Sequence, residues 1–417
     1  MGVRGGKTRV AVGLLLLLLA VTLFWVGFLR ARLPLPLQPP SVAGRHTPPP
    51  VFQRCVLLLV DALRWDACAQ GTHSPTAHEG AMTALHVSQG GRLFRFIADP
   101  PTTTSQRVRA LLAGTLPSFT DALQNFDADP VPGDHLFRQL DPHSVVMIGD
   151  DTWTRLFPES RGYYLKAETL HSFDIFDLDT TDSISIPKLR AELRRGVEER
   201  GPDWQLLITH LLGVDHCGHR YGVEHPEMAR KLRDMNELIF EVMQSMDTHE
   251  EYNNTLLLVM GDHGQTLSGQ HGGGSPEEVE TCLFAYAGAR SGLQPSDHIE
   301  DVFQTDFAAT LAEALGVEYP QESLGHPESS LFSWHPRMQL RASQQAPVLW
   351  RVCVHLGMSP SECGHLLSPV LLGHRAVDHM ISLLEKYQRE TKNMLFSPEE
   401  ESRLSNQLRH VHGWFLR

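Results

Sequence analysis

Short apolar segments alternate with segments of helical periodicity through most of this chain. Apolar segments rich in Val, Ile and Leu, each bounded by turn residues, occur at 55–60, 145–148, 206–209, 255–260 and 282–286. Because these segments do not alternate with polar residues, they predict strands that are covered on both faces. Helical patterns lie between them, at 105–113, 187–200, 226–247 and 301–315. The alternation predicts an α/β fold, with a doubly wound, mixed or parallel sheet and helices on both faces.

The N-terminus follows a different pattern. Val10–Leu29 is a run of 20 residues without a charge, which as a helix would span ~30 Å, the thickness of a bilayer's hydrocarbon core. We interpret it as an uncleaved transmembrane signal anchor. Arg4, Lys7 and Arg9 precede it, which predicts that residues 1–9 lie in the cytosol. A cleaved signal peptide is the alternative, although its apolar region is usually only ~7–15 residues long.

The remaining chain divides by composition into three parts. Residues 30–52 are rich in proline and predict an extended linker. Residues 53–320 hold all the predicted strands and form the expected catalytic domain. Residues 321–417 form a helical, charged tail in which we find neither chemistry nor a second membrane span. The triplet Asn253-Asn254-Thr255 is a glycan acceptor that agrees with a lumenal domain.

Charge and cysteine content narrow the function further. The formal net charge of −13 excludes a general attraction to nucleic acid. The six cysteines form no CxxC pair, so neither a thiolate zinc site nor a thioredoxin-like motif is expected. Cys55 and Cys282 lie in apolar segments and predict core positions. Cys353 and Cys363 could pair in an oxidising compartment, which their spacing alone does not establish.

Metal-ligand side chains follow three of the predicted strands. Because ligands in an open α/β sheet lie beyond the carboxyl ends of strands, we expect these side chains at one edge. They are Asp61, then Asp215, His216 and His219, then Asp262 and His263, with His271 shortly after. Taken singly, each could be a helix cap or a polar loop residue, and His210 could be a core histidine or support a ligand. Together they indicate one or two divalent ions, Zn²⁺ first and Mn²⁺ second.

A threonine cluster precedes the predicted helix at 105–113. The segment "DPPTTTSQRVRALLAGTLP", residues 99–117, places hydroxyl and N–H groups near a helix N-terminus. That position favours anions such as phosphate. A threonine hydroxyl whose pKa is lowered by zinc is a competent nucleophile for phosphoryl transfer. The alternative is that the cluster only caps the helix.

These segments in this order resemble the alkaline phosphatase superfamily. Within it, the chain resembles the glycosylphosphatidylinositol (GPI) ethanolamine-phosphate transferases over residues 53–320. The resemblance is carried by "LLLVDALR", "PPTTTSQR", "GTLPSF", "GDDTW", "THLLGVDHCGHRYG" and "GDHGQT…GQHGGG". "DPPTTT", "GDDTW" and "LLGVDHCGH" are the segments most specific to the transferases. After about residue 320 we expect the chain to be truncated or divergent relative to that family, whose members continue with many membrane spans.

The resemblance implies a site with two zinc ions. One ion would be held by Asp215, His219 and His271. The other would be held by Asp61, Asp262, His263 and the nucleophile. Thr104 would be that nucleophile, because it precedes Gly114 by the spacing that the superfamily shows, with Thr103 as the fallback.

The resemblance also implies a reaction and a cellular location for the protein. Phosphoethanolamine would pass from phosphatidylethanolamine to Thr104, and then to a mannose of the GPI-anchor precursor, with the third mannose as the expected acceptor. The enzyme would lie in the endoplasmic reticulum membrane with its catalytic domain in the lumen, together with a membrane-bound stabilising subunit. The alternatives are a zinc-dependent phosphodiesterase or phosphatase of the same fold, or an inactive binding or regulatory form.

Overall fold

The computed structural model describes residues 13–23 and most of 50–331. Its gaps within the second range are 72–75, 87–88, 117–129, 132, 172–176 and scattered positions between 290 and 330. The chain divides into two compact units, Met1–Gly325 and His326–Arg417. The predictions made for residues 1–9, for most of the linker and tail, and for a Cys353–Cys363 pair lie outside the described residues.

The described residues form one mixed sheet of eight strands, in the order β4-β3-β5-β1-β6-β7-β2-β8. The strands are β1 (Arg54–Val60), β2 (Gly91–Ile97), β3 (Val145–Asp150), β4 (Tyr164–Leu170), β5 (Leu206–Leu211), β6 (Thr255–Met260), β7 (Glu280–Tyr286) and β8 (Asp301–Phe303). All five predicted strands are present, and β1, β3, β5 and β6 are adjacent and parallel. β7 runs antiparallel to both of its neighbours, β6 and β2.

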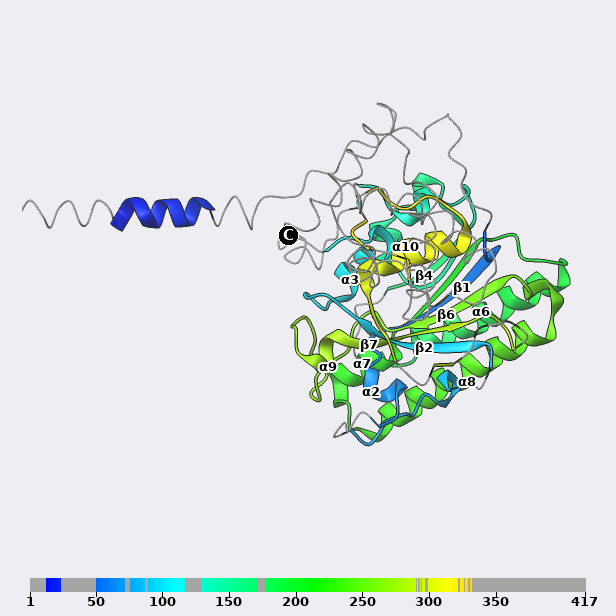
Figure 1. The fold of residues 1–417 in the computed structure, drawn as a ribbon. Helices are drawn as coiled ribbons and strands as arrows, with labels where there is room; N and C mark the ends of the chain where they lie inside the picture. Colours follow the sequence, from blue (N-terminus) through cyan, green and yellow to red (C-terminus); the bar gives the residue numbers. More distant parts are fainter. Residues whose placement is uncertain are drawn as a thin grey trace, which may run out of the picture. The chain divides into compact units, whose positions relative to one another are not determined.

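Helices cover both faces of this sheet, as the strand patterns predicted (Figure 1). Alternate residues of β1, beginning with Val56 and Leu58, share one apolar cluster with helices α6 and α8. On the other face α3 packs against α10, and Phe307 of α10 lies edge-on to Phe96 of β2. The longer helices are α3 (Thr104–Ala113), α6 (Thr180–Glu198), α7 (Gly213–Tyr221), α8 (Pro226–Thr248) and α10 (Gln304–Leu315).

Two predicted helix starts are wrong. The helix expected from 187 begins at Thr180, so Pro187 lies inside α6. A proline lacks the N–H that a helix interior uses, but Pro187 is exposed and α6 continues through it. The helix expected from 301 begins at Gln304, because residues 301–303 pair with β2 as strand β8.

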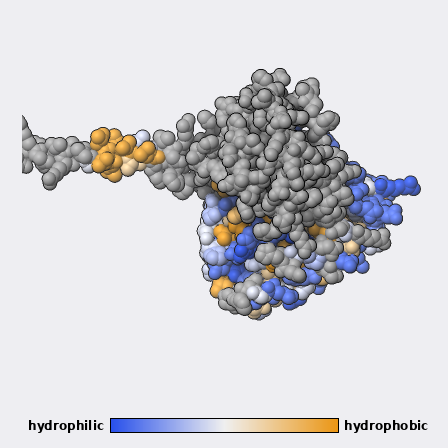
Figure 2. Space-filling model, viewed as in Figure 1, coloured by the Kyte–Doolittle hydropathy of each residue, from blue (hydrophilic) through white to orange (hydrophobic). Residues whose placement is uncertain are grey.

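The predicted membrane anchor is described only in part. Residues 13–23 are helical, and their leucines are exposed, with Leu14 at 63% and Leu23 at 64%. Figure 2 shows this segment as a hydrophobic surface. Within residues 13–23 and the described part of 50–331, no helix has the length and apolar character needed to cross a bilayer. The span Val10–Leu29 therefore remains a prediction.

Candidate metal centre

The ends of three adjacent strands bring the predicted ligands together. Val60 of β1 pairs with Leu211 of β5, and Leu59 pairs with Met260 of β6. Asp61 follows β1 at the carboxyl edge of the sheet. At the same edge β5 is followed by α7, which carries Asp215 and His219, and β6 is followed by Asp262. The turn after Asp61 is tight: Ala62 has a φ of 56°, which is uncommon for a residue other than glycine. The Ala62 N–H donates to Asp262 Oδ1 over 3.3 Å, which joins the first strand end to the third.

Asp215, His219 and His271 form the first half of the cluster. Asp215 and His219 lie one turn apart on α7, and His219 Nε2 is 3.4 Å from Asp215 Oδ2. His271 begins the glycine-rich loop 271–274, which follows β6 in the chain. Its Nε2 lies 3.5 Å from Asp215 Oδ1. The two imidazole nitrogens, Nε2 of His219 and Nε2 of His271, face each other at 3.0 Å. Three candidate ligand side chains thus converge from two segments of the chain.

Asp61, Asp262, His263 and Thr104 form the second half. His263 Nε2 lies 3.4 Å from Asp61 Oδ1 and 3.5 Å from Asp262 Oδ2. The Thr104 hydroxyl donates to Asp61 Oδ2 over 3.3 Å and lies 3.4 Å from His263 Nε2. The His263 and His271 rings stack at 4.1 Å between centroids, which joins the two halves.

The buried carboxylates of the cluster offer oxygens that lack hydrogen-bond partners within the described part of the chain. Burial, together with the charge of Asp61, raises the pKa of Asp215 and of Asp262 well above the usual range. Although burial also opposes ionisation of Asp61, its hydrogen bond to His210 and the charge of His263 hold its pKa below the usual range. Among the described residues, Asp61 Oδ1, Asp215 Oδ1 and Asp262 Oδ2 are buried without a hydrogen-bond partner. Unpaired buried oxygens of this kind are costly, and a metal ion would remove the cost.

The histidines are oriented to offer lone pairs. His263 Nδ1 lies 2.9 Å from the Gly264 carbonyl and His271 Nδ1 lies 2.8 Å from the Thr102 carbonyl. Each Nδ1 must therefore carry the proton, since a carbonyl only accepts, and each Nε2 presents a lone pair to the cluster. Burial, with the nearby His271, lowers the pKa of His263 to about 3, which keeps it neutral. The residues present therefore fit divalent cations.

Thr102 fixes the distance between α3 and the glycine-rich loop. The Gly272 N–H donates to Thr102 Oγ1, and Thr102 Oγ1 donates to the Gly273 carbonyl, each over 2.9 Å. Gly272 has a φ of +111°, which favours glycine at this position. Together with the His271 contact, these bonds hold the loop against the residues that precede α3.

The two candidate nucleophiles point differently. Thr104 is the first residue of α3, and its hydroxyl reaches the cluster through Asp61 and His263. Thr103 precedes the helix and turns its methyl group toward Gly272, since a Cβ at Gly272 would lie 3.5 Å from Thr103 Cγ2. Of the two threonines, Thr104 is the one whose hydroxyl lies at the cluster.

His210 is nearer the cluster than its sequence context indicated. It is the last but one residue of β5, is fully buried, and places its Nε2 3.3 Å from Asp61 Oδ2. Trp153 donates its indole N–H to His210 Nδ1 over 3.0 Å. Burial disfavours the charged imidazole, but Asp61 and Asp150 outweigh it and raise the pKa of His210 to about 9. Bound cations would neutralise the carboxylates that cause this shift.

Proximity alone groups the ligand atoms differently from the expected sets. Asp61, His210 and Asp262 form one triplet, and Asp215, His263 and His271 form the other, each with its atoms within 4.8 Å. His216 is not part of either, because its Nδ1 contacts the Asp177 carbonyl. Trp153 and His210 belong to the segments GDDTW and THLLGVDHCGHRYG, but nothing in the sequence indicated that their side chains form a pair beside Asp61.

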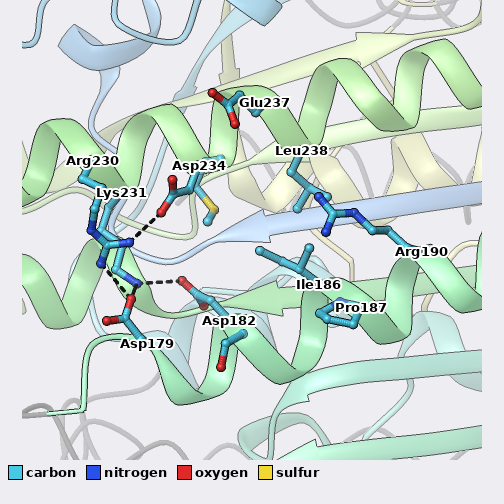
Figure 3. Close-up of a pocket in the computed structure, with 12 residues that line it drawn as sticks. Asp179, Asp182, Ile186, Pro187, Arg190, Arg230, Lys231, Asp234, Glu237 and Leu238 are labelled. Carbon is cyan, nitrogen blue, oxygen red and sulfur yellow. Dashed lines mark hydrogen bonds and ion pairs between the residues drawn. The ribbon is translucent and has the colours of Figure 1, made fainter.

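A buried ion pair anchors the helix that carries Asp215 and His219. The carboxylate of Asp182, from α6, accepts the N–H groups of Leu212 and Gly213 at the start of α7. Lys231 of α8 lies 3.4 Å from Asp182 and supplies the opposite charge. A Cβ at Gly213 would collide with Asp182, so the close approach depends on glycine. Figure 3 shows this pair at a cavity of about 300 Å³ between α6 and α8.

Comparison with known proteins agrees with the resemblance read from the motifs. The chain is 40% identical over 298 residues to the human "GPI ethanolamine phosphate transferase 3, catalytic subunit", covering 68% of this chain and 26% of that protein. It is 38% identical over 343 residues to the mouse protein of the same name, covering 75% of this chain and 30% of that one. The chain therefore spans less than a third of the length of these two relatives.

Solved structures give a looser match. One is the wild-type alkaline phosphatase PafA, at 11% identity and a TM-score of 0.49, covering 68% of this chain and 99% of that one. The profile of the type I phosphodiesterase / nucleotide pyrophosphatase family matches residues 55–273, more than half of the chain. That range contains Asp61, Thr104 and every other predicted ligand. The chain belongs to the type I phosphodiesterase / nucleotide pyrophosphatase family.

Proposed function

We propose that this chain is a metal-dependent phosphoethanolamine transferase of GPI-anchor synthesis. The observation that carries the proposal is the Thr104 hydroxyl, held 3.3 Å from Asp61 and 3.4 Å from His263 within a cluster of carboxylates and imidazoles. The relatives named as GPI ethanolamine phosphate transferases support the choice of the transferred group.

Two zinc ions are the proposed cofactors, with manganese as the second choice. Asp215, His219 and His271 would hold one ion, and Asp61, Asp262, His263 and Thr104 would hold the other. Imidazole and carboxylate without thiolate is a donor set that both metals accept. When bound, the ions would lower the pKa of a hydroxyl and neutralise negative charge on the phosphoryl group.

The residues of the chain then perform two displacements. Thr104 Oγ1 attacks the phosphorus of phosphatidylethanolamine; the bond from phosphorus to the diacylglycerol oxygen breaks, and that oxygen takes up the proton that Thr104 loses. The 6-hydroxyl of a GPI mannose then attacks phosphorus, the bond to Thr104 breaks, and Thr104 regains a proton. The N-terminus of α3 favours the anionic group throughout.

The proposed place and partners follow the same relatives. The acceptor would be the third mannose, and the catalytic domain would lie in the lumen of the endoplasmic reticulum. Val10–Leu29 would anchor it in the membrane, and a membrane-bound subunit would stabilise it. No contact with nucleic acid is proposed, because the chain carries a net charge of −13.

The test is to trap the covalent intermediate. The full chain, loaded with zinc in detergent, is mixed with phosphatidylethanolamine without an acceptor, and its peptides are searched for phosphoethanolamine by mass spectrometry. We expect the adduct on Thr104, its loss in Thr104→Ala, and its retention in the matched control Thr103→Ala. An adduct on Thr103, or none on a protein with bound zinc, would contradict the proposal.

Hydrolysis is the second candidate, because the family description names phosphodiesterases and pyrophosphatases. The same two displacements would then end on water and release free phosphoethanolamine. Adding a mannose-containing GPI glycan to the trapped protein separates the candidates. Transfer to the glycan supports the transferase, whereas free phosphoethanolamine at an unchanged rate supports the hydrolase.

A further inference from the structure

The indole of Trp153 and the imidazole of His210 form a buried pair behind the cluster. Trp153 lies on the short helix α5 (Thr152–Leu156), and both side chains are fully buried. His210 sits on β5 between β1 and β3, opposite Leu59 and Gly149. Gly149 allows this packing, because a Cβ there would collide with the His210 carbonyl. The surrounding backbone therefore leaves the imidazole little freedom to move.

The chemistry of the indole determines which nitrogen of His210 carries the proton. An indole N–H can only donate, and it lies 3.0 Å from His210 Nδ1. Nδ1 must therefore accept, although Asp150 Oδ2 is also nearby at 3.5 Å. In this tautomer Nε2 holds the proton, and Nε2 lies 3.3 Å from Asp61 Oδ2.

Thr104 and His210 thus approach the same oxygen of Asp61, Thr104 through a hydrogen bond and His210 Nε2 at ion-pair distance. Thr104 Oγ1 and His210 Nε2 are each 3.3 Å from Oδ2. The other oxygen, Oδ1, is buried without a hydrogen-bond partner among the described residues and lies 3.4 Å from His263 Nε2. A carboxylate whose one oxygen is held against polar groups of the protein leaves the other oxygen free for a cation.

We propose that Trp153 and His210 are positioning residues that hold Asp61 with Oδ1 toward the metal ions, Trp153 acting through the tautomer of His210. This rests on the metal site of the proposed function. Hydrogen bonds from outer groups commonly fix the orientation of metal ligands, and losing one costs about 10–100-fold in metal affinity. A pair that served only packing would have no such effect on zinc binding.

The test compares zinc affinity in the full chain, by competition with a chelator, across four variants. We expect His210→Ala to weaken zinc binding about 10–100-fold, and Trp153→Phe to weaken it by less. His210→Gln should keep most of the affinity, because its amide oxygen can accept from Trp153 and its amide N–H can donate to Asp61. Trp204→Phe is the matched control, since this buried indole has no hydrogen-bond partner among the described residues.

Two further measurements separate positioning from packing. In a His210→Ala background, Trp153→Phe should have no additional effect on zinc affinity, because Trp153 acts through His210. In ¹⁵N-histidine spectra of the zinc-loaded protein, His210 should show a proton on Nε2 and none on Nδ1, and Trp153→Phe should weaken this preference.

Three results would overturn the inference. These are unchanged zinc affinity in His210→Ala, an equal loss in Trp153→Phe and Trp204→Phe, or a His210 proton on Nδ1. These readouts need no turnover, so failure of the transferase assay would leave them intact. If the wild-type chain binds no zinc, the proposed function fails together with this role for the pair.

Discussion

At the scale of single residues, His219 and His216 offer a matched comparison within one helix. His219 faces His271 Nε2 at 3.0 Å, whereas His216 contacts the backbone of Asp177. We predict that His219→Ala loses zinc and lowers transfer at least about 10–100-fold, the loss expected even for an outer partner of a ligand. His216→Ala should retain the zinc. Metal analysis of the two purified variants checks this, and equal zinc content would contradict it.

The buried carboxylates predict how stability depends on pH. Burial raises the pKa of Asp215 and Asp262 above the usual range. A raised folded-state pKa gives a contribution that is present below the unfolded pKa and is lost as pH rises through the folded value. The metal-free protein should therefore lose this contribution as the two groups ionise, and zinc should offset the loss.

We predict that zinc raises the melting temperature more as pH increases from the acidic side toward the raised pKa values. Thermal melts with zinc and with chelator across a pH series measure this. The difference should shrink in Asp215→Asn, which removes one of the carboxyl groups. A zinc effect that does not change with pH would show that these groups do not ionise in the range their burial indicates.

At the scale of elements, two ion pairs join α6 to α8 in different surroundings. Asp182 and Lys231 are buried, with side chains 6% and 2% exposed, whereas Arg190 and Glu241 are each 48% exposed. Removing one partner of a buried pair costs about 3 kcal/mol or more, and an exposed pair contributes about 0–1 kcal/mol. Lys231→Met should therefore destabilise the fold far more than Arg190→Ala.

Chemical denaturation of the two variants tests that difference. Since Asp182 caps the start of α7, we also expect Lys231→Met to lower zinc affinity through Asp215 and His219. Arg190→Ala should leave zinc affinity unchanged. Equal losses of stability in the two variants would mean that the burial of Lys231 and Asp182 contributes nothing beyond an ordinary surface pair.

The sequence predicted the strands that are buried on both faces, but it did not predict β2, β4 or β8. Strands β1, β3, β5 and β6 were found because both of their faces are apolar, and the ends of β1, β5 and β6 indicated the candidate ligands. β4 lies at the edge of the sheet with mostly half-buried or exposed residues, so its pattern carries no such signal. β2 places Arg92 and Arg95 among its apolar residues, and β8 has only three residues.

The direction of a strand and the contacts between distant side chains could not be predicted from the local pattern of apolar and polar residues. An apolar segment reads the same in either direction, so nothing in residues 282–286 indicates that β7 is antiparallel. His210 lies within an apolar segment and looks like a core residue until Asp61 and Trp153 are placed beside it. Distances between residues as far apart in sequence as 61 and 210 depend on strand order, which a single sequence does not contain.

At the scale of the whole molecule, the side of the membrane is testable through Asn253. This residue is exposed between the short helical turn Glu250–Tyr252 and β6, where a glycan would meet no obstacle from the described fold. We predict a glycosidase-sensitive mass shift in cells that is lost in Asn253→Gln. Digestion of the domain by protease added outside intact microsomes would place it in the cytosol instead and contradict the lumenal assignment.

The central place of β1 has a consequence during synthesis on the ribosome. β1 is the first strand among the residues that the structure describes, yet its partners β5 and β6 begin at Leu206 and Thr255. At about 5–20 residues per second, roughly ten to forty seconds pass before both partners are made. Until β5 is made both edges of this apolar strand are unpaired, and until β6 is made one edge still lacks its partner, which invites pairing with other chains. The nascent protein should therefore depend on chaperones until residues near 260 have emerged, and the metal cluster can form only after that.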